Sequence, residues 1–360
     1  MIPYVKFHVD DDVREAVNRV LDSGRYVLGK ETEMFEHELA SYIGVKYGIA
    51  TSSGTASLFL ILKALNIGSG NEVIVPAYTF IAAFSPVLMV GAKPVFVDVN
   101  YDTMTIEPEL IEKAITPKTR AIIIVHQFGH PADMDPIKEI AEKHGLIIIE
   151  DCAEAHGAMY KGKKVGSIGD VSFFSFYPTK NLTVYGDGGM VLTNDYELAE
   201  KIRLLRHHGQ VDMEKYMMLG YNFRLSEIHA AIGRVELKKL DGRNKIRREL
   251  AKVYNEELID YVEIPKEKDW AYHVYNVYTI KVEKRKRVMQ YLEKNGIEFG
   301  VYYKKPANKY GILPSSIRRI KYEVASTLSK KCLSLPISHN HSKEEIQYVA
   351  ECIKKAIKVS

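Results

Sequence analysis

The chain contains 360 residues, of which 46% are hydrophobic and 27% charged, which is an ordinary balance for a globular protein with a substantial core. A formal net charge of only +4 gives no electrostatic support for nucleic-acid binding, and no metal-ligand spacing is present, so we expect neither nucleic acid nor metal. Three widely spaced cysteines, an apolar stretch at 77–92 too short for a bilayer, and an N-terminus without signal-peptide layout predict a cytoplasmic protein without membrane contact.

The first part of the chain alternates helical and strand patterns. In chain order we expect helices at 11–22 and 31–43, a strand at 47–51, a helix at 58–65, a strand at 71–76, a helix opening at 79–80, a strand at 93–99, a helix at 107–115, a strand at 121–125, a helix at 134–144 and a strand at 146–151. The strand runs are continuously apolar, which indicates burial on both faces. This pattern predicts an α/β fold with a mainly parallel sheet covered by helices on both sides.

The second part of the chain changes character. A β-type run ends at Phe176, and after it we expect a helix at 195–208, a polar loop at 209–221 and a long helix at 226–259. Near residue 241 charges become dense, and the expected elements are strands at 274–282 and 297–303 with helices at 285–295, 315–330 and 343–358. We therefore predict a large α/β domain at 1–240 and a smaller α+β domain at 241–360.

Four features of the sequence follow predicted strands directly. They are the Ser53-Gly54 turn, Phe80, Asp151 and Lys180. Ligands of parallel sheets bind at the carboxyl ends of strands, so we expect these residues to converge on one site. The Ser/Gly turn also opens a helix, where free backbone N–H groups bind phosphate, although ordinary N-capping gives the same residues.

These parts are the ones that hold pyridoxal phosphate. A lysine binds the cofactor covalently, an aspartate keeps the pyridine nitrogen protonated, a helix N-terminus takes the phosphate and an aromatic side chain stacks on the ring. Taken singly, Lys180 reads as a surface lysine, and Asp151 as an N-cap or structural ion pair. Their combination favours the cofactor.

The sequence resembles the DegT/StrS family of sugar aminotransferases, which are fold-type-I pyridoxal-phosphate enzymes of the aspartate aminotransferase superfamily. The resemblance covers nearly the whole chain. The motifs that carry it are Ser53-Gly-Thr-Ala56, Pro76-Ala-Tyr-Thr-Phe80, Gly129-His-Pro-Ala-Asp-Met134, Glu150-Asp-Cys-Ala-Glu-Ala-His-Gly157, Phe174-Ser-Phe-Tyr-Pro-Thr-Lys-Asn181, Gly186-Asp-Gly-Gly189 and Asn222-Phe-Arg-Leu225.

The resemblance assigns cofactor contacts to particular residues. It implies that Lys180 binds the cofactor, that Asp151 partners the pyridine nitrogen and that Phe80 stacks on the ring. Gly54, Thr55 and Ser175 would contact the phosphate, and Glu154 would lie near the 3-oxygen, where many relatives carry glutamine. Asn222 would come from the neighbouring protomer, which implies a homodimer with composite active sites.

The resemblance also implies the reaction. L-Glutamate would donate the amino group and leave as 2-oxoglutarate, and the acceptor would be a keto group at C3 or C4 of a nucleotide-diphosphate-linked deoxysugar. The product would be an amino sugar for surface polysaccharide or glycoconjugate synthesis. The loop at 23–29 looks like relatives that act at C3, whereas the segments at 152–154 and 220–224 look more like those that act at C4.

Substrate contacts follow less directly from the motifs. The candidates are His156, Tyr185, Arg224, Tyr302, Tyr303 and Asn308, with Arg25, Tyr26, Lys30, His207 and His208 as further possible contacts of the nucleotide. Relatives often carry histidine where this chain has Tyr302 and Asn308, so the identity of the sugar stays open.

Two other functions remain to be weighed. One is an aminotransferase that acts on a non-nucleotide ketone such as a keto-cyclitol, which a substrate panel would distinguish. The other is a regulatory protein that keeps the fold without the chemistry. The presence of both Lys180 and Asp151, and the absence of a strongly basic face, argue against regulation.

Overall fold

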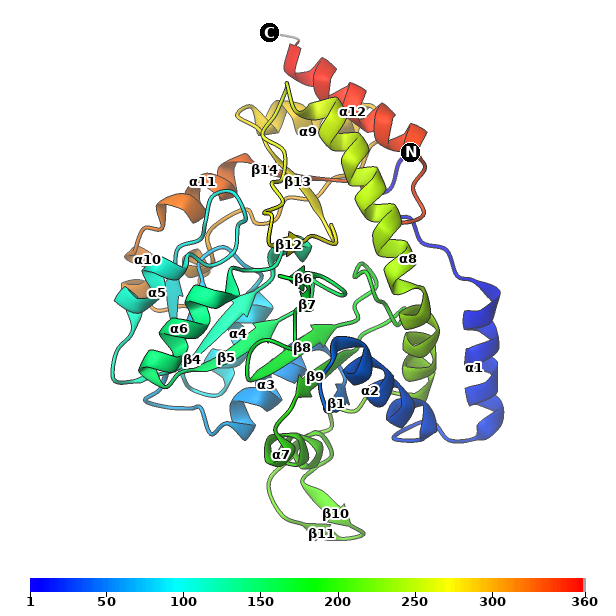
Figure 1. Ribbon diagram of the computed structural model, residues 1–360, viewed down its shortest axis with the longest axis vertical. Coiled ribbons are helices and arrows are strands. Elements are labelled where there is room, and N and C mark those ends of the chain that lie inside the picture. The colour runs from blue at the N-terminus through cyan, green and yellow to red at the C-terminus, as the bar shows by residue number, and fades with distance from the viewer. Residues whose placement is uncertain (359–360) are drawn as a thin grey trace.

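The computed structural model describes residues 1–358 and is built around a seven-stranded sheet in the order β1-β9-β8-β5-β4-β2-β3 (Figure 1). The strands are β1 (Tyr47–Thr51), β2 (Glu72–Pro76), β3 (Lys93–Val97), β4 (Thr119–Val125), β5 (Ile147–Asp151), β8 (Val171–Ser175) and β9 (Gly189–Thr193). β9 is antiparallel to both of its neighbours, whereas the other adjacent strands are parallel. The predicted mainly parallel α/β sheet is confirmed.

Helices cover both faces of this sheet. Successive residues of a strand point to opposite faces, so strands that are continuously apolar need packing partners on both sides. In β4, Ile123 packs into a core shared with α3 (Gly54–Ala64), α4 (Ser85–Met89) and α7 (Tyr196–Arg206). Its neighbours Ile122 and Ile124 pack into a second core with α5 (Pro108–Ala114) and α6 (Met134–His144). A third core lies where β8 and β9 meet α2 (Lys30–Ile43). All of these strand positions are buried, which explains their continuous apolar sequence.

The small C-terminal unit packs on the far half of one long helix, α8 (Glu227–Leu258). In α8, Leu237 and Leu240 join the core under β8 and β9, whereas Leu250 and Leu258 join the core of the C-terminal unit. That unit contains β13 (Tyr278–Lys281), α9 (Arg285–Lys294), β14 (Cys332–Leu335) and α12 (Lys343–Lys358). The expected boundary at 240/241 therefore falls inside a continuous helix, at the point where its packing partners change.

Shorter elements complete the described chain. They are α1 (Asp11–Ser23), η1 (Ile81–Ala83), η2 (Gln127–Gly129), β6 (Met159–Tyr160), β7 (Lys163–Lys164), β10 (Gln210–Asp212), β11 (Lys215–Tyr216), β12 (Ala271–Tyr272), η3 (Ala307–Lys309), α10 (Ser315–Arg319) and α11 (Glu323–Lys331). Among residues 1–358, no helix combines the length and the apolarity that crossing a membrane requires.

Several expected elements differ in the structure. The expected strand at 297–303 is wrong: it makes only single bridges, at Ile297 and Gly300, because the hydroxyl of Tyr78 takes up the backbone groups of Tyr302 and Tyr303 that a strand partner would use. The expected strand at 274–282 shortens to β13, and the helix expected at 315–330 divides into α10 and α11. The loop at 209–221 contains the β10–β11 hairpin, and α3 begins four residues earlier than expected, at Gly54.

Candidate active site

The carboxyl ends of β1, β2, β5 and β8 surround one pocket with a volume of about 370 Å³, which we call the strand-end pocket. Its lining residues are Tyr4, Val5, Ser53, Gly54, Thr55, Thr79, Phe80, Ala82, Ala83, Val125, Asp151, Ala153, Glu154, Phe173, Ser175, Tyr177, Thr179, Lys180, Asp187, Asn276, Val277, Tyr302 and Tyr303. The four features that follow predicted strands are all among them. Their convergence, expected from the sequence, is confirmed.

The turn between β1 and α3 forms one end of the strand-end pocket. Ser53 is the N-cap of α3, and its Oγ accepts a hydrogen bond from the backbone N–H of Ala56 at 3.1 Å. The first N–H groups of a helix have no partner within it, and the residues that open α3, Gly54 and Thr55, line the pocket. A Cβ atom on Gly54 would lie 2.9 Å from Cβ of Ser175, so only glycine lets β8 approach this closely. Backbone donors and the Thr55 and Ser175 hydroxyls form a compact set of groups that fits a phosphate, which we call the phosphate cradle.

Asp151 closes β5 and lies buried at the base of the strand-end pocket. Its Oδ1 accepts one hydrogen bond, from the backbone N–H of Ala153 at 3.0 Å. Burial raises the pKa of Asp151 to about 7, and the charge of Glu154 adds to the rise, whereas Lys180 lowers it. A cation placed against this carboxyl would stabilise its ionised form, and a protonated pyridine nitrogen is such a cation.

Lys180 stands in the connection between β8 and β9, where its backbone N–H donates to the carbonyl of Tyr177 at 2.9 Å. Its Nζ donates to Oε1 of Glu154 at 3.1 Å. The other oxygen of Glu154 accepts from the backbone N–H of Phe128 at 2.9 Å, so Glu154 is itself held in place. Among residues 1–358, Lys180 carries the only side-chain amine that lines the pocket, and a fixed carboxylate orients it.

Phe80 presents an open aromatic face to the pocket. It follows β2, and 56% of its surface is exposed although it is a large apolar side chain. Its ring centroid lies 6.3 Å from that of Tyr303, and the two ring planes are inclined by 30°. Such a face suits stacking by a flat heterocycle. The amine, the carboxyl, the phosphate cradle and this ring together fit pyridoxal phosphate.

Of the residues expected at the substrate, Tyr302 and Tyr303 line the strand-end pocket and the other four do not. His156 is buried between Phe174 and Phe176, where desolvation lowers its pKa to about 3. Asn308 is fully buried, and its Nδ2 donates to the carbonyls of Ile317 and Ile320. The side-chain amide of Asn308 therefore holds a loop of the protein in place.

Tyr185, Asn222 and Arg224 lie outside the strand-end pocket of their own chain. The hydroxyl of Tyr185 donates to the carbonyl of His8 at 2.8 Å. Arg224 Nε donates to Oδ1 of Asn222 at 2.9 Å. The further candidates for the nucleotide, which are Arg25, Tyr26, Lys30, His207 and His208, do not line the pocket either.

The sequence did not indicate several of the lining residues. Tyr4 and Val5 come from the N-terminus and Asn276 from the C-terminal unit, so their meeting depends on contacts across almost the whole chain. Tyr177 and Asp187 flank the connection that carries Lys180, and their proximity to Lys180 in sequence was the available signal. For Tyr4 no local pattern marks a pocket residue.

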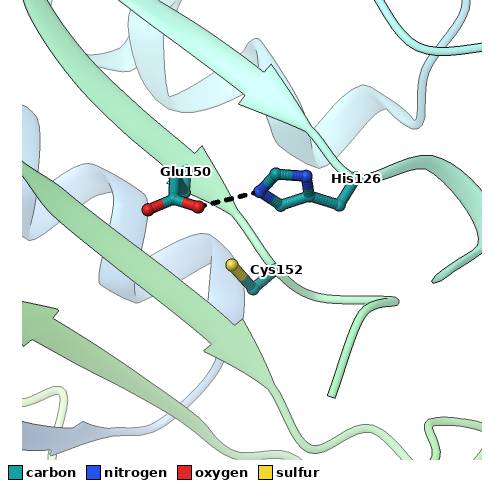
Figure 2. A group of neighbouring side chains, drawn as sticks. All are labelled: His126, Glu150 and Cys152. Carbon is teal, nitrogen blue, oxygen red and sulfur yellow. Dashed lines mark hydrogen bonds and ion pairs between the residues drawn. The ribbon is translucent and has the colours of Figure 1, made fainter. Parts of the chain in front are cut away.

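A buried group of His126, Glu150 and Cys152 lies beside the end of β5 and has ligand atoms within 4.8 Å of one another (Figure 2). Nδ1 of His126 accepts from the backbone N–H of Ala132 at 3.0 Å, so its Nε2 carries the proton and donates to Oε2 of Glu150 at 3.0 Å. Neither ring nitrogen keeps a lone pair for a metal. Burial also raises the pKa of the Cys152 thiol well above its ordinary value. The group is a hydrogen-bonded network.

Comparison with known proteins gives one family and close relatives. The model of the DegT/DnrJ/EryC1/StrS aminotransferase family matches residues 8–354. The chain is 42% identical to the "Pleiotropic regulatory protein" of Geobacillus stearothermophilus, over 95% of this chain and 93% of that protein. It is also 42% identical to the UDP-N-acetyl-3-dehydro-alpha-D-glucosamine 3-aminotransferase of Acidithiobacillus ferrooxidans, over 96% and 94%.

A solved structure resembles the whole fold. The crystal structure of Streptomyces venezuelae DesV in complex with a ketimine intermediate superposes with a TM-score of 0.94, is 39% identical in sequence, and covers 97% of this chain and 95% of its own. The similarity therefore includes both the sheet and the C-terminal unit.

Proposed function

The chain belongs to the DegT/DnrJ/EryC1/StrS aminotransferase family, and on this basis we propose that it transfers the amino group of L-glutamate to the C3 keto group of a nucleotide-diphosphate-linked sugar. It is an enzyme, and its cofactor is pyridoxal 5′-phosphate. One observation carries the assignment: Lys180, Asp151 and the Gly54 turn line the same strand-end pocket. A regulatory protein would have no need of this combination.

The cofactor supplies an electron sink that lets an amino group and a proton move between two substrates. Side chains of the protein would orient the cofactor. With the cofactor bound, the carboxylate of Asp151 would hold the proton on the pyridine nitrogen, the turn at Gly54 and Thr55 would bind the phosphate with the Ser175 hydroxyl, and the ring of Phe80 would fix the plane; all of these residues line the pocket. Each role uses a group that is present in the pocket and has capacity left for a ligand.

Lys180 moves protons at Nζ. As a neutral amine it takes the proton from Cα of glutamate, and it returns a proton to the sugar carbon in the second half of the reaction. Its hydrogen bond to Glu154, 3.1 Å long, orients Nζ. Overall, L-glutamate and the keto sugar become 2-oxoglutarate and the amino sugar, so atoms and electrons balance without another reactant.

The substrate assignment comes from the relatives' names together with the pocket. The Acidithiobacillus relative is named for a UDP-linked sugar with a 3-keto group, which makes a UDP-linked 3-keto sugar the first candidate here. The product would enter surface polysaccharide or glycoconjugate synthesis. The three cysteines are unpaired and buried, which supports the cytoplasm as the compartment.

We also propose a homodimer with shared active sites. The charged residues that line the strand-end pocket are Asp151, Glu154, Asp187 and one cation, Lys180. The phosphate, the diphosphate and the glutamate carboxylates are anions, so further donors and cations must come from outside this set. Asn222 and Arg224 of a second copy can supply them. The adjoining β10–β11 hairpin projects from the body (Figure 1) and exposes Val211, Met213, Tyr216, Met217 and Leu219, as expected of a surface that a partner covers.

A reconstituted assay tests the activity. Purified enzyme is incubated with L-glutamate and a panel of UDP- and dTDP-linked 3-keto and 4-keto sugars, with a free keto-cyclitol as the alternative acceptor. We expect one 2-oxoglutarate for each 3-amino sugar formed. Lys180→Ala abolishes turnover, whereas Lys46→Ala, which changes an exposed lysine before β1, has no effect. Preference for the free cyclitol would replace the sugar assignment.

Mixed dimers test the shared site. A heterodimer of Lys180→Ala and Asn222→Ala subunits contains one site with both substitutions and one site with neither, if Asn222 acts across the interface. We expect activity to return in the heterodimer while each homodimer stays impaired. A verified heterodimer without recovered activity would refute the shared site.

A further inference from the structure

Positive charge is unevenly distributed along the chain. Residues 281–331 contain 14 lysines and arginines and four acidic residues, a surplus of ten positive charges, whereas the whole chain carries only +4. The rest of the chain is therefore net negative. Averaging over the chain led us to expect no strongly basic face, and that expectation is wrong for this region. A local surplus of this size points to an anionic partner.

Six of these cations lie in the loop at 304–321, which we call the basic loop. No acidic residue stands between Glu298 and Glu323, so the basic loop contains no negative side chain. Among residues 1–358, no carboxylate oxygen lies within 4.0 Å of any of its cations, so the fold leaves their charges uncompensated. The six are Lys304, Lys305, Lys309, Arg318, Arg319 and Lys321. All of them except Lys309 are exposed.

The basic loop has a fixed conformation. Nδ2 of Asn308 donates to the carbonyls of Ile317 and Ile320, and Nζ of Lys309 donates to the carbonyl of Ile320 at 2.8 Å. Leu313 and Ile317 are buried in the core that the loop shares with the central sheet. The polar and apolar anchors of the loop therefore point inward, and its remaining side chains form a defined outer surface.

That outer surface contains aliphatic groups as well as cations. Ile312 is 57% exposed and Ile320 is 48% exposed. The loop's one aromatic residue, Tyr310, packs beside Phe84 with 6.0 Å between ring centroids, and Nζ of Lys305 lies 4.5 Å from its ring centroid. Nucleic-acid surfaces stack bases on open aromatic rings, which the basic loop lacks. Surfaces that lie on a bilayer combine aliphatic side chains with lysine and arginine, which the basic loop has.

The start of α9 adds further cations to the same C-terminal unit. A surface hollow of about 490 Å³ lies there, and its lining residues are Glu283, Lys284, Arg285, Lys286, Arg287 and Lys330. Nη1 of Arg285 donates to the carbonyls of Ser329 at 2.7 Å and Cys332 at 3.0 Å, which ties α9 to the end of α11. α11 begins at Glu323, just after the basic loop. The positive potentials of the two regions therefore add.

We propose that the basic loop docks the enzyme on an anionic membrane surface. Its arginines and lysines face the lipid phosphates, and Ile312 and Ile320 enter the boundary between headgroups and acyl chains. We expected no membrane contact because the apolar stretch at 77–92 is too short to span a bilayer, but binding at the surface requires no spanning segment. α10 lies at the edge of the molecule, apart from the β10–β11 hairpin (Figure 1), so this surface and the proposed dimer contact are separate. The inference goes beyond amino-group transfer and does not depend on it.

Co-sedimentation with lipid vesicles tests the proposal on the enzyme loaded with its cofactor. One set of vesicles is phosphatidylcholine alone, and the other is phosphatidylcholine mixed in equal parts with the anionic phosphatidylglycerol. The basic-loop variant carries Arg318→Gln, Arg319→Gln and Lys321→Gln together. A second variant carries Ile312→Ser and Ile320→Ser. Amino-group transfer in solution is measured for each protein to show that it is folded and active.

A matched control removes the same charge from another surface. It carries Lys46→Gln, Lys113→Gln and Lys118→Gln, which change exposed lysines of the α/β domain. Because its net charge equals that of the basic-loop variant, any difference in vesicle binding between the two reports the position of the cations.

We expect the wild type to sediment with the anionic vesicles and not with phosphatidylcholine alone, and added salt should weaken the binding. The basic-loop variant should bind the anionic vesicles about a hundredfold more weakly, because each cation at such a surface contributes about a factor of five. The isoleucine variant should bind about tenfold more weakly. The control should bind as the wild type does, and all four proteins should transfer amino groups at the same rate.

Absence of wild-type binding to the anionic vesicles would overturn the proposal, and so would an equal loss in the control. Release of the bound enzyme by excess UDP would assign the cations to the substrate phosphates instead. A single-stranded RNA that binds more tightly than the vesicles, with no effect of the isoleucine variant, would make nucleic acid the partner. Each of these results would refute membrane docking and leave the aminotransferase activity standing.

Discussion

Glu150 and Asp151 are consecutive buried carboxyl residues at the end of β5, yet their surroundings are opposite. Glu150 accepts four hydrogen bonds, from His126 and from the backbone N–H groups of Gly166, Ile168 and Gly169, and its pKa is lowered despite complete burial. Asp151 accepts one, from Ala153, and burial raises its pKa to about 7. Alternation along the strand puts the first in the fold's interior and the second in the pocket.

The difference separates a carboxylate that the fold satisfies from one that it leaves available to a ligand. Glu150 fixes the loop at 166–169 against β5, and the protein itself supplies everything the charge requires. Asp151 keeps capacity for a cation that the chain does not provide. This unused capacity supports the proposal that Asp151 faces the cofactor.

Among the substitutions that test this comparison, Asp151→Asn should cause the largest loss of activity. The neutral amide cannot hold the proton on the pyridine nitrogen, so we expect kcat/KM to fall by about a thousandfold or more, equivalent to about 4 kcal/mol in the barrier. Steady-state kinetics with both substrates measures the loss. Asp212→Asn, in the exposed hairpin, controls for the substitution. A variant that kept about a tenth of wild-type activity would remove Asp151 from its assigned role.

The pH dependence of the free energy of unfolding should show how much the buried carboxyl of Asp151 destabilises the cofactor-free protein once it is ionised. The folded-state pKa of about 7 lies above the ordinary value of 3.8, so the folded, cofactor-free protein binds the proton more tightly than the unfolded chain. Its contribution to stability is full below about pH 4 and is lost as the pH rises to about 7, by about 4 kcal/mol. Urea unfolding should therefore show that the free energy of unfolding of the wild type falls relative to that of Asp151→Asn as the pH rises from about 4 to about 7. Parallel pH profiles would contradict the raised pKa.

Glu150→Gln should damage the fold and leave the chemistry intact. The new amide would direct N–H groups at backbone donors and would lack the negative charge that strengthens the four hydrogen bonds, so we expect the free energy of unfolding to fall by about 3 kcal/mol. Denaturant titration measures this loss. Folded Glu150→Gln should bind the cofactor and turn over at close to the wild-type rate. Unchanged stability would show that the network around Glu150 is not structural.

Glu154→Gln should have the smallest effect. Glutamine keeps an oxygen for either Lys180 or the Phe128 N–H but not for both, so Nζ of Lys180 is less well oriented. We expect kcat to fall by about three- to tenfold with little change in stability. Rapid-mixing kinetics of the glutamate half-reaction measures it directly. A loss as large as that of Asp151→Asn would make Glu154 a proton-transfer group.

The parallel sheet and the convergence of Gly54, Phe80, Asp151 and Lys180 could be predicted because they depend on local pattern and on one rule of sheet topology. Four continuously apolar runs show where these strands end, and residues at the carboxyl ends of parallel strands meet at one edge of the sheet. β9 was missed because it begins at the last glycine of the turn-like run Gly186-Asp-Gly-Gly189. Tyr4 is held by Glu298, 294 residues away, and the bend at Tyr302 depends on Tyr78, 224 residues away, and no local pattern encodes such contacts.

The central claim is that the unsatisfied groups of the strand-end pocket hold pyridoxal phosphate on Lys180. Borohydride reduction of the purified enzyme, followed by peptide mapping with mass spectrometry, tests it directly. We predict that the visible absorbance of the enzyme is lost and that the pyridoxyl phosphate mass appears on the peptide containing Lys180, and on no other. The mass on a different lysine, or an unmodified Lys180 after complete bleaching, would contradict the account.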